Sequence, residues 1–133
     1  MRLVALSLAL LSLAFAPAPL PKAGPKDMDL KGLQGTWIGP GNLVARFEGD
    51  TLRYYRGGEL VRSYRISIDP SARPRQMDLV GIGADKGLRY YYVYDLDGDT
   101  LKTSGNARDE PRPTAFEGKG RGRGVEFFQR KKR

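Results

Sequence analysis

The chain has 133 residues and a formal net charge of +8, and it contains neither cysteine nor histidine. The missing cysteines exclude disulfides, cysteine zinc sites and thiol nucleophiles, and the missing histidines remove the side chain on which most general acid–base enzymes depend. Because no catalytic motif or phosphate-binding glycine loop is present either, we expect a protein that is not an enzyme and that uses no cofactor.

Residues 1–22 have the features of a secretory signal peptide and its processing region. Arg2 is followed by an apolar run over residues 3–15, which is shorter than the about 20 residues that a membrane-spanning helix needs. We therefore expect an exported protein that is periplasmic, envelope-associated or extracellular, with no membrane span after signal removal. The alternative is an uncleaved membrane anchor.

The next segment, residues 23–32, belongs to a stretch rich in proline and lysine, and we expect it to be a flexible tether. A single domain then covers residues 33–133. It opens with Leu33-Gln34-Gly35-Thr36-Trp37, which holds the only tryptophan and is predicted to form the first strand. Alternate residues of this strand, Leu33, Gly35 and Trp37, share one face.

Strand-like segments and glycine-containing turns alternate through the rest of the domain. The alternation of apolar and polar residues is longest over residues 59–68, and the segment most typical of a strand is 88–96. Gly57-Gly58 is a two-residue hairpin signal. About eight strands follow one another through short turns, except across residues 105–124, and eight is a number at which such a sheet can close. The sequence therefore predicts an all-β fold, an antiparallel up-and-down barrel.

Aromatic residues recur on one face of the predicted strands and could line the barrel interior. They are Phe47, Tyr54, Tyr64, Tyr90 and Tyr92. Such a lining suits a small apolar or aromatic ligand, and a binding module of this kind is the first functional hypothesis. The alternative is an ordinary barrel core, since tyrosine is a common strand residue. Arg62 falls on the same face, and we place it near the barrel mouth.

The C-terminal end is basic, with nine Lys/Arg against four Asp/Glu over residues 108–133. The candidate polyanion-binding residues are Lys119, Arg121, Arg123, Arg130, Lys131, Lys132 and Arg133. The second functional hypothesis is an interaction or structural protein that binds an acidic partner, such as an envelope polymer, through this end. The alternative is a solvated basic surface that keeps the protein soluble. Export argues against nucleic acid as the partner.

An acidic run, Asp95-Leu96-Asp97-Gly98-Asp99, could be taken for a calcium-binding loop. An EF-hand loop needs glycine at its sixth position and glutamate at its twelfth. Those positions hold Thr100 and Asn106. A tight turn explains the run better, and we expect no metal site.

Three short motifs occur in a fixed order along the chain: LQGTW at residues 33–37, GDTL at 98–101 and RPTAF at 112–116. With these motifs the sequence resembles a family of small exported domains known mainly from planctomycete bacteria. The resemblance covers about residues 30 to 131. That family has no assigned activity, so the resemblance implies a fold and a compartment but no mechanism.

Gly35-x-Trp37 also looks like the G-x-W signature of the lipocalins. In that superfamily the tryptophan closes the barrel floor beneath an arginine of the last strand, and the resemblance implies this role for Arg130. We therefore assign barrel closure to Gly35, Trp37, Phe127 and Arg130. The pairing of Arg130 with Trp37 requires that Phe128 face the interior, because residues two apart in a strand share a face.

Overall fold

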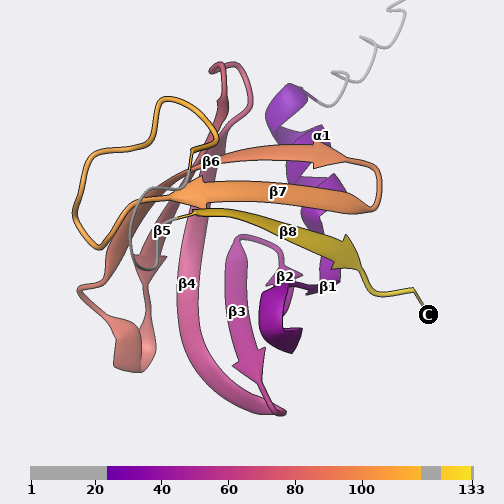
Figure 1. The fold of residues 1–133 in the computed structure, drawn as a ribbon, viewed down its shortest axis with the longest axis vertical. Helices are drawn as coiled ribbons and strands as arrows, with labels where there is room; N and C mark the ends of the chain where they lie inside the picture. The colour runs from indigo at the N-terminus through magenta and orange to yellow at the C-terminus, as the bar shows by residue number, and fades with distance from the viewer. Residues whose placement is uncertain (1–23, 118–123, 133) are drawn as a thin grey trace, which may run out of the picture.

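The computed structural model describes residues 24–117 and 124–132, which form a closed barrel of eight antiparallel strands (Figure 1). The strands are β1 (Gly35–Ile38), β2 (Val44–Glu48), β3 (Thr51–Arg56), β4 (Glu59–Asp69), β5 (Arg75–Gly81), β6 (Arg89–Asp97), β7 (Thr100–Gly105) and β8 (Gly124–Arg130). Each strand pairs with the next in the chain, and β8 returns to pair with β1. This confirms the predicted all-β, up-and-down barrel.

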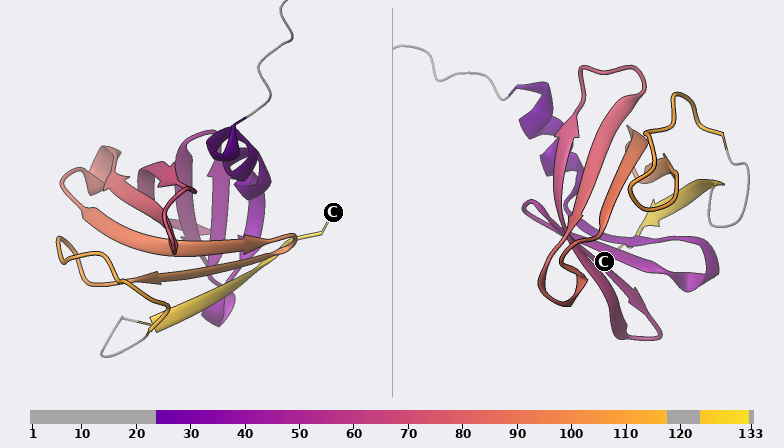
Figure 2. Two further views of the ribbon diagram at one scale, coloured as in Figure 1. Left: turned by 90° about the horizontal axis from the view of Figure 1, so that it is seen from above. Right: turned by 90° about the vertical axis from the view of Figure 1, so that its left-hand side faces the viewer.

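The strand connections lie at two ends of the barrel. One end carries the β2–β3 and β6–β7 turns and the β4–β5 loop, together with helix α1 (Pro25–Leu33). We call it the helix end. The opposite end carries two 3-10 turns, η1 (Pro40–Asn42) and η2 (Gly83–Asp85), the β3–β4 hairpin and the long β7–β8 connection. Figure 2 shows the two sets of connections from two further directions.

Helix α1 occupies most of the segment where a flexible tether was expected. Pro25 stands in its first turn together with the acidic Asp27, and Lys31 stands in its last turn, a charge order that complements the helix dipole. Leu33 is fully buried, so the helix is docked on the barrel by its C-terminal turn. The predicted signal segment, residues 1–22, lies outside the described residues.

The interior is a continuous apolar core toward the helix end. Its buried members include Leu33, Trp37, Phe47, Leu52, Ile66, Ile68, Met77, Leu79, Tyr94, Leu101 and Phe128. Trp37 has no exposed surface, and its indole Nε1–H donates to the Leu33 carbonyl oxygen at 2.8 Å. The indole therefore fastens the end of α1 to the first strand.

Arg130 covers Trp37 from β8, with its guanidinium carbon 4.2 Å from the indole centroid. Phe128 shares the inward face with Arg130 and is 1% exposed, whereas Phe127 is 56% exposed. The assignment of Phe127 to barrel closure is therefore corrected, and Phe128 fills the interior in its place. Gly35 adopts a φ of 111°, a backbone conformation that favours glycine.

The segment after β7 is the one connection where no short turn was predicted, and the structure holds its described part against the outside of the sheet. Arg112 donates to the Tyr92 carbonyl oxygen at 2.8 Å and pairs with Asp78. The Lys102 ammonium group makes a cation–π contact with Phe116, 4.1 Å from the centroid of its ring. The arginine and phenylalanine of the RPTAF segment therefore anchor this loop.

Candidate ligand-binding site

Four tyrosines face the interior toward the end opposite the helix. They form a row of edge-to-face contacts, with centroid distances of 6.0 Å between Tyr54 and Tyr64, 5.9 Å between Tyr64 and Tyr90, and 6.2 Å between Tyr90 and Tyr92. Each distance lies in the range of favourable aromatic pairs. We call these four residues the tyrosine row. Tyr64 is buried, while the other three keep partial exposure.

Phe47 was predicted to line the same surface, but it lies elsewhere. It is 3% exposed, and it pairs with Gly35 and Leu52 near the helix end. Phe47 therefore belongs to the filled core. The other four predicted lining residues are brought together by the structure.

A glycine makes room for one end of the tyrosine row. Gly105 on β7 lies opposite Tyr92 on β6, and a Cβ atom added at residue 105 would stand 1.8 Å from Cε1 of the Tyr92 ring. The ring therefore lies directly over the glycine. The absence of a side chain at this position sets where the Tyr92 ring can lie.

Glu126 on β8 was missed as a site residue by the sequence reasoning. It alternates with the outward Phe127 and lies opposite Thr103, which is 5% exposed, so its side chain faces inward. Among the described residues Glu126 has no hydrogen-bond or ion-pair partner. The signal was available in the sequence, because any register that buries Phe128 also turns Glu126 inward.

The Glu126 carboxylate acts electrostatically on two of the phenols. Burial raises the pKa of Glu126 above its ordinary value. Burial, followed by the charge of Glu126, also raises the pKa of Tyr92. Tyr54 has a raised pKa from burial first and then from Tyr92 and Glu126. Glu126 is therefore close enough to act on two members of the row.

Burial raises the pKa of the Tyr54 and Tyr92 phenols of the tyrosine row, and it raises the pKa of Tyr64 to about 12. None of the four hydroxyl groups makes a hydrogen bond with another described residue, in contrast to Tyr94, whose hydroxyl donates to Asp29 at 2.7 Å. With respect to residues 24–117 and 124–132, the four hydroxyls therefore keep hydrogen-bonding capacity for a ligand or for water.

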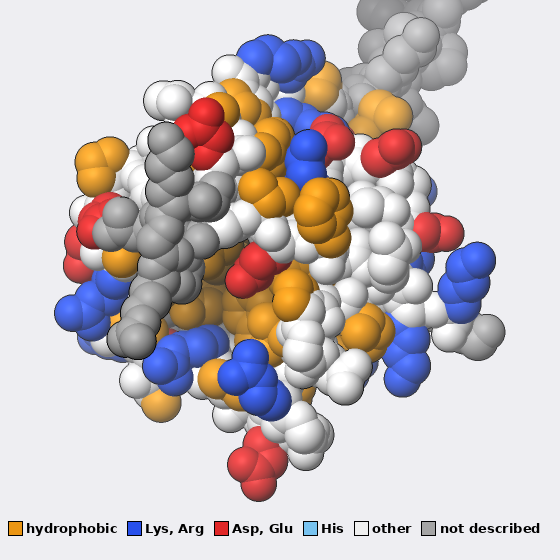
Figure 3. Space-filling model, viewed as in Figure 1, with side chains coloured by type: hydrophobic (Ala, Val, Ile, Leu, Met, Phe, Trp, Pro, Cys, Tyr) orange, Lys and Arg blue, Asp and Glu red, His pale blue; other side chains and the backbone are white. Residues whose placement is uncertain are grey.

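The molecular surface is hollowed beside strands β3, β4 and β8 (Figure 3). Hydrophobic side chains line this hollow, and both acidic and basic side chains lie at its rim. Arg62, predicted near the barrel mouth, is half-exposed and lies 3.7 Å from the Asp85 carboxylate on η2. We call this open side of the interior the mouth.

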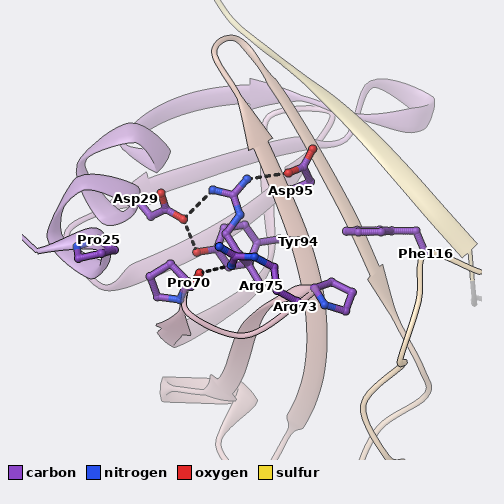
Figure 4. A pocket seen from close by; sticks show the side chains of 9 residues that line it. Pro25, Asp29, Pro70, Arg73, Arg75, Tyr94, Asp95 and Phe116 are labelled. Atoms are coloured by element: carbon purple, nitrogen blue, oxygen red, sulfur yellow. Dashed lines mark hydrogen bonds and ion pairs between the residues drawn. The ribbon is translucent and has the colours of Figure 1, made fainter.

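A second cavity, of about 430 Å³, lies at the helix end between α1, the β4–β5 loop and Phe116 (Figure 4). Asp29 of α1 accepts hydrogen bonds from Arg75 at 2.9 Å and from the Tyr94 hydroxyl. Arg75 also donates to Asp95 at 2.6 Å. Because these charges satisfy one another, the cluster is explained by the docking of α1 on the barrel.

The basic C-terminal residues are placed only in part. Lys119, Arg121, Arg123 and Arg133 lie outside the described residues. Arg130 is engaged with Trp37 and with Asp99, while Lys131 and Lys132 are exposed. The surface groove that these two lysines border also contains Glu48 and Asp99, so its charge is mixed.

A scan against protein-family models and searches of curated proteins and of solved structures found no significant match. In residues 24–117 and 124–132 there is no group of three or more acidic side chains placed to hold a metal ion. No helix in the same part of the chain is long and apolar enough to cross a membrane. The interpretation of the site therefore comes from its geometry.

Proposed function

We propose that this chain is an exported binding module that holds a small apolar or aromatic ligand at the mouth of its barrel. The observation that carries the proposal is the tyrosine row, a continuous aromatic wall that is partly open to solvent. Aromatic side chains supply large contact areas and defined ring geometries, which suit flat apolar molecules. Their hydroxyls add polar groups that can orient such a molecule.

The division of the interior supports this proposal. Toward the helix end the core is filled by side chains such as Trp37, Leu101 and Phe128, each at most 1% exposed. At the other end, phenylalanines would have packed without hydroxyls to satisfy, yet the chain places tyrosines there. A filled floor beneath an amphipathic wall is the arrangement expected of a pocket that closes at one end.

The test is a fluorescence titration with N-phenyl-1-naphthylamine, a neutral apolar probe that brightens in an apolar site. We expect saturable binding to the intact protein and a loss of about tenfold in affinity for Tyr90→Ala and Tyr92→Ala, because each removes an aromatic contact. Tyr55→Ala is the matched control, since Tyr55 lies next to Tyr54 on the opposite face of β3.

Trp37 emission reports whether each variant is folded, because Trp37 lies in the filled core. Equal affinities for Tyr55→Ala and the two row variants would contradict the proposed site. An absence of saturable binding to the intact protein would contradict the proposed function.

A further inference from the structure

Within residues 24–117 and 124–132, the charged side chains that face inward are almost all paired. Arg75 pairs with Asp29 and Asp95 at the helix end. Arg130 pairs with Asp99 at 3.0 Å. Arg62, at the mouth, lies 3.7 Å from Asp85. Glu126 differs from these residues, because no described residue forms an ion pair with it.

An unpaired carboxylate in a partly buried position is unfavourable, because burial disfavours its charged form. The structure adds a second unfavourable feature. Glu126 acts electrostatically on Tyr54 and Tyr92, whose ring faces also carry negative potential. The mouth therefore places a carboxylate beside aromatic rings, and the positive charge of Arg62 acts on a third ring of the row, Tyr64. Groups held in such an arrangement are typical of binding sites.

A cation would compensate both features at once. A carboxylate pairs with it directly, and tyrosine faces attract it through the cation–π interaction at centroid distances up to about 6 Å. Inorganic Mg²⁺ and Ca²⁺ do not fit, because they need several oxygen ligands and this site offers one carboxylate. An organic ammonium group suits the site better, since its carbon substituents can also contact the apolar wall.

We propose that the ligand of the mouth is a small organic cation, an amine or quaternary ammonium group joined to an apolar or aromatic substituent. The Glu126 carboxylate pairs with the charge, and the rings of Tyr54 and Tyr92 present their faces to the ammonium group. This inference rests on the proposed function and specifies the charge of the ligand.

The experiment compares three ligands with the same ring system by displacement of N-phenyl-1-naphthylamine. They are 2-naphthylmethyl-trimethylammonium, neutral 2-naphthalenemethanol and anionic 2-naphthoate. For the intact protein we expect the cation to bind about tenfold more tightly than the alcohol, and the anion to bind most weakly. In Glu126→Gln we expect the cation and the alcohol to bind within about twofold of each other.

Glu59→Gln is the matched control, because Glu59 is an exposed glutamate at the same end of the barrel. We expect it to keep the preference for the cation. Equal binding of all three ligands to the intact protein would overturn the inference while leaving the binding function supported. A cation preference that survives in Glu126→Gln would also overturn it. If neither the probe nor any of the three ligands binds, the proposed function itself fails.

Discussion

The guanidinium carbon of Arg130 lies 4.2 Å from the centroid of the Trp37 ring, and Nη1 of the same arginine donates to the Gln34 carbonyl oxygen at 2.7 Å. Trp37 in turn donates to the Leu33 carbonyl oxygen at the end of α1. One pair of side chains therefore joins the last strand, the first strand and the helix. Barrel closure and helix docking depend on the same contact.

Arg130→Met should destabilise the fold by about 1–3 kcal/mol, because it removes charge-assisted hydrogen bonds to backbone and a cation–π contact. Urea unfolding followed by Trp37 fluorescence measures the change. Lys131→Met is the control, since Lys131 is the exposed next residue, and its stability should match that of the intact protein. Equal stabilities for the two variants would refute the role given to Arg130.

Asp29→Ala should weaken the docking of α1 and lower the free energy of unfolding by about 1–3 kcal/mol, because it leaves the Tyr94 hydroxyl without its acceptor. Arg75 loses one of its two carboxylate partners in the same variant. Limited proteolysis should cut within residues 25–33 faster than in the intact protein. Asp27→Ala, an exposed position on the same helix, serves as the comparison. Similar cleavage rates for both variants would argue against the docking role of Asp29.

The barrel follows from the sequence because its determinants are local. Alternation along residues 59–68 and 88–96 marks strands, and glycine pairs such as Gly57-Gly58 mark the turns between them. Once the strands follow one another through short turns, closure requires only that the last strand reach the first. The sequence also predicts that Arg130 lies over Trp37 only if Phe128 faces the interior. Phe128 is buried in the structure, so this condition is met.

Helix α1 could not be derived in the same way, and the inward position of Glu126 could be stated only on the condition that Phe128 is buried. The helix segment is short and rich in proline and lysine, and its order comes from contacts with residues distant in the chain, such as Arg75 and Tyr94. Short helices gain most of their stability from such packing. Whether the Glu126 side chain faces inward depends on the register of the final strand, because a shift of one residue moves every side chain to the other face of the sheet.

Gly105→Ala should lower the affinity for N-phenyl-1-naphthylamine, because the new methyl group would displace the Tyr92 ring from its place in the row. Overpacking of this kind also costs about 1–3 kcal/mol of stability. Gly124→Ala is a close control, since Gly124 lies directly opposite Gly105 on β8 and a Cβ atom there meets nothing within 4 Å. Unchanged probe binding in Gly105→Ala would show that the position of Tyr92 does not matter to the site.

Glu126→Gln should make the unliganded protein more stable at neutral pH. The pKa of Glu126 is raised in the folded protein by burial, so folding favours its protonated form. The intact protein therefore holds its full stability below the ordinary carboxyl pKa of about 4.3 and loses part of it as the pH rises through the folded-state pKa. Glutamine stays neutral throughout and avoids this loss.

Urea unfolding of the intact protein and of Glu126→Gln at about pH 3.5 and at pH 7 tests the direction of this stability difference. The lower pH lies below the ordinary glutamate pKa. The free energies of unfolding should agree at the acidic pH, and Glu126→Gln should be the more stable at pH 7. Glu59→Gln should show no such crossover. A Glu126→Gln protein that is less stable at pH 7 would mean that the carboxylate has a stabilising partner in the folded chain. A saturating organic cation should remove the advantage of the variant, because it stabilises only the protein that keeps the carboxylate.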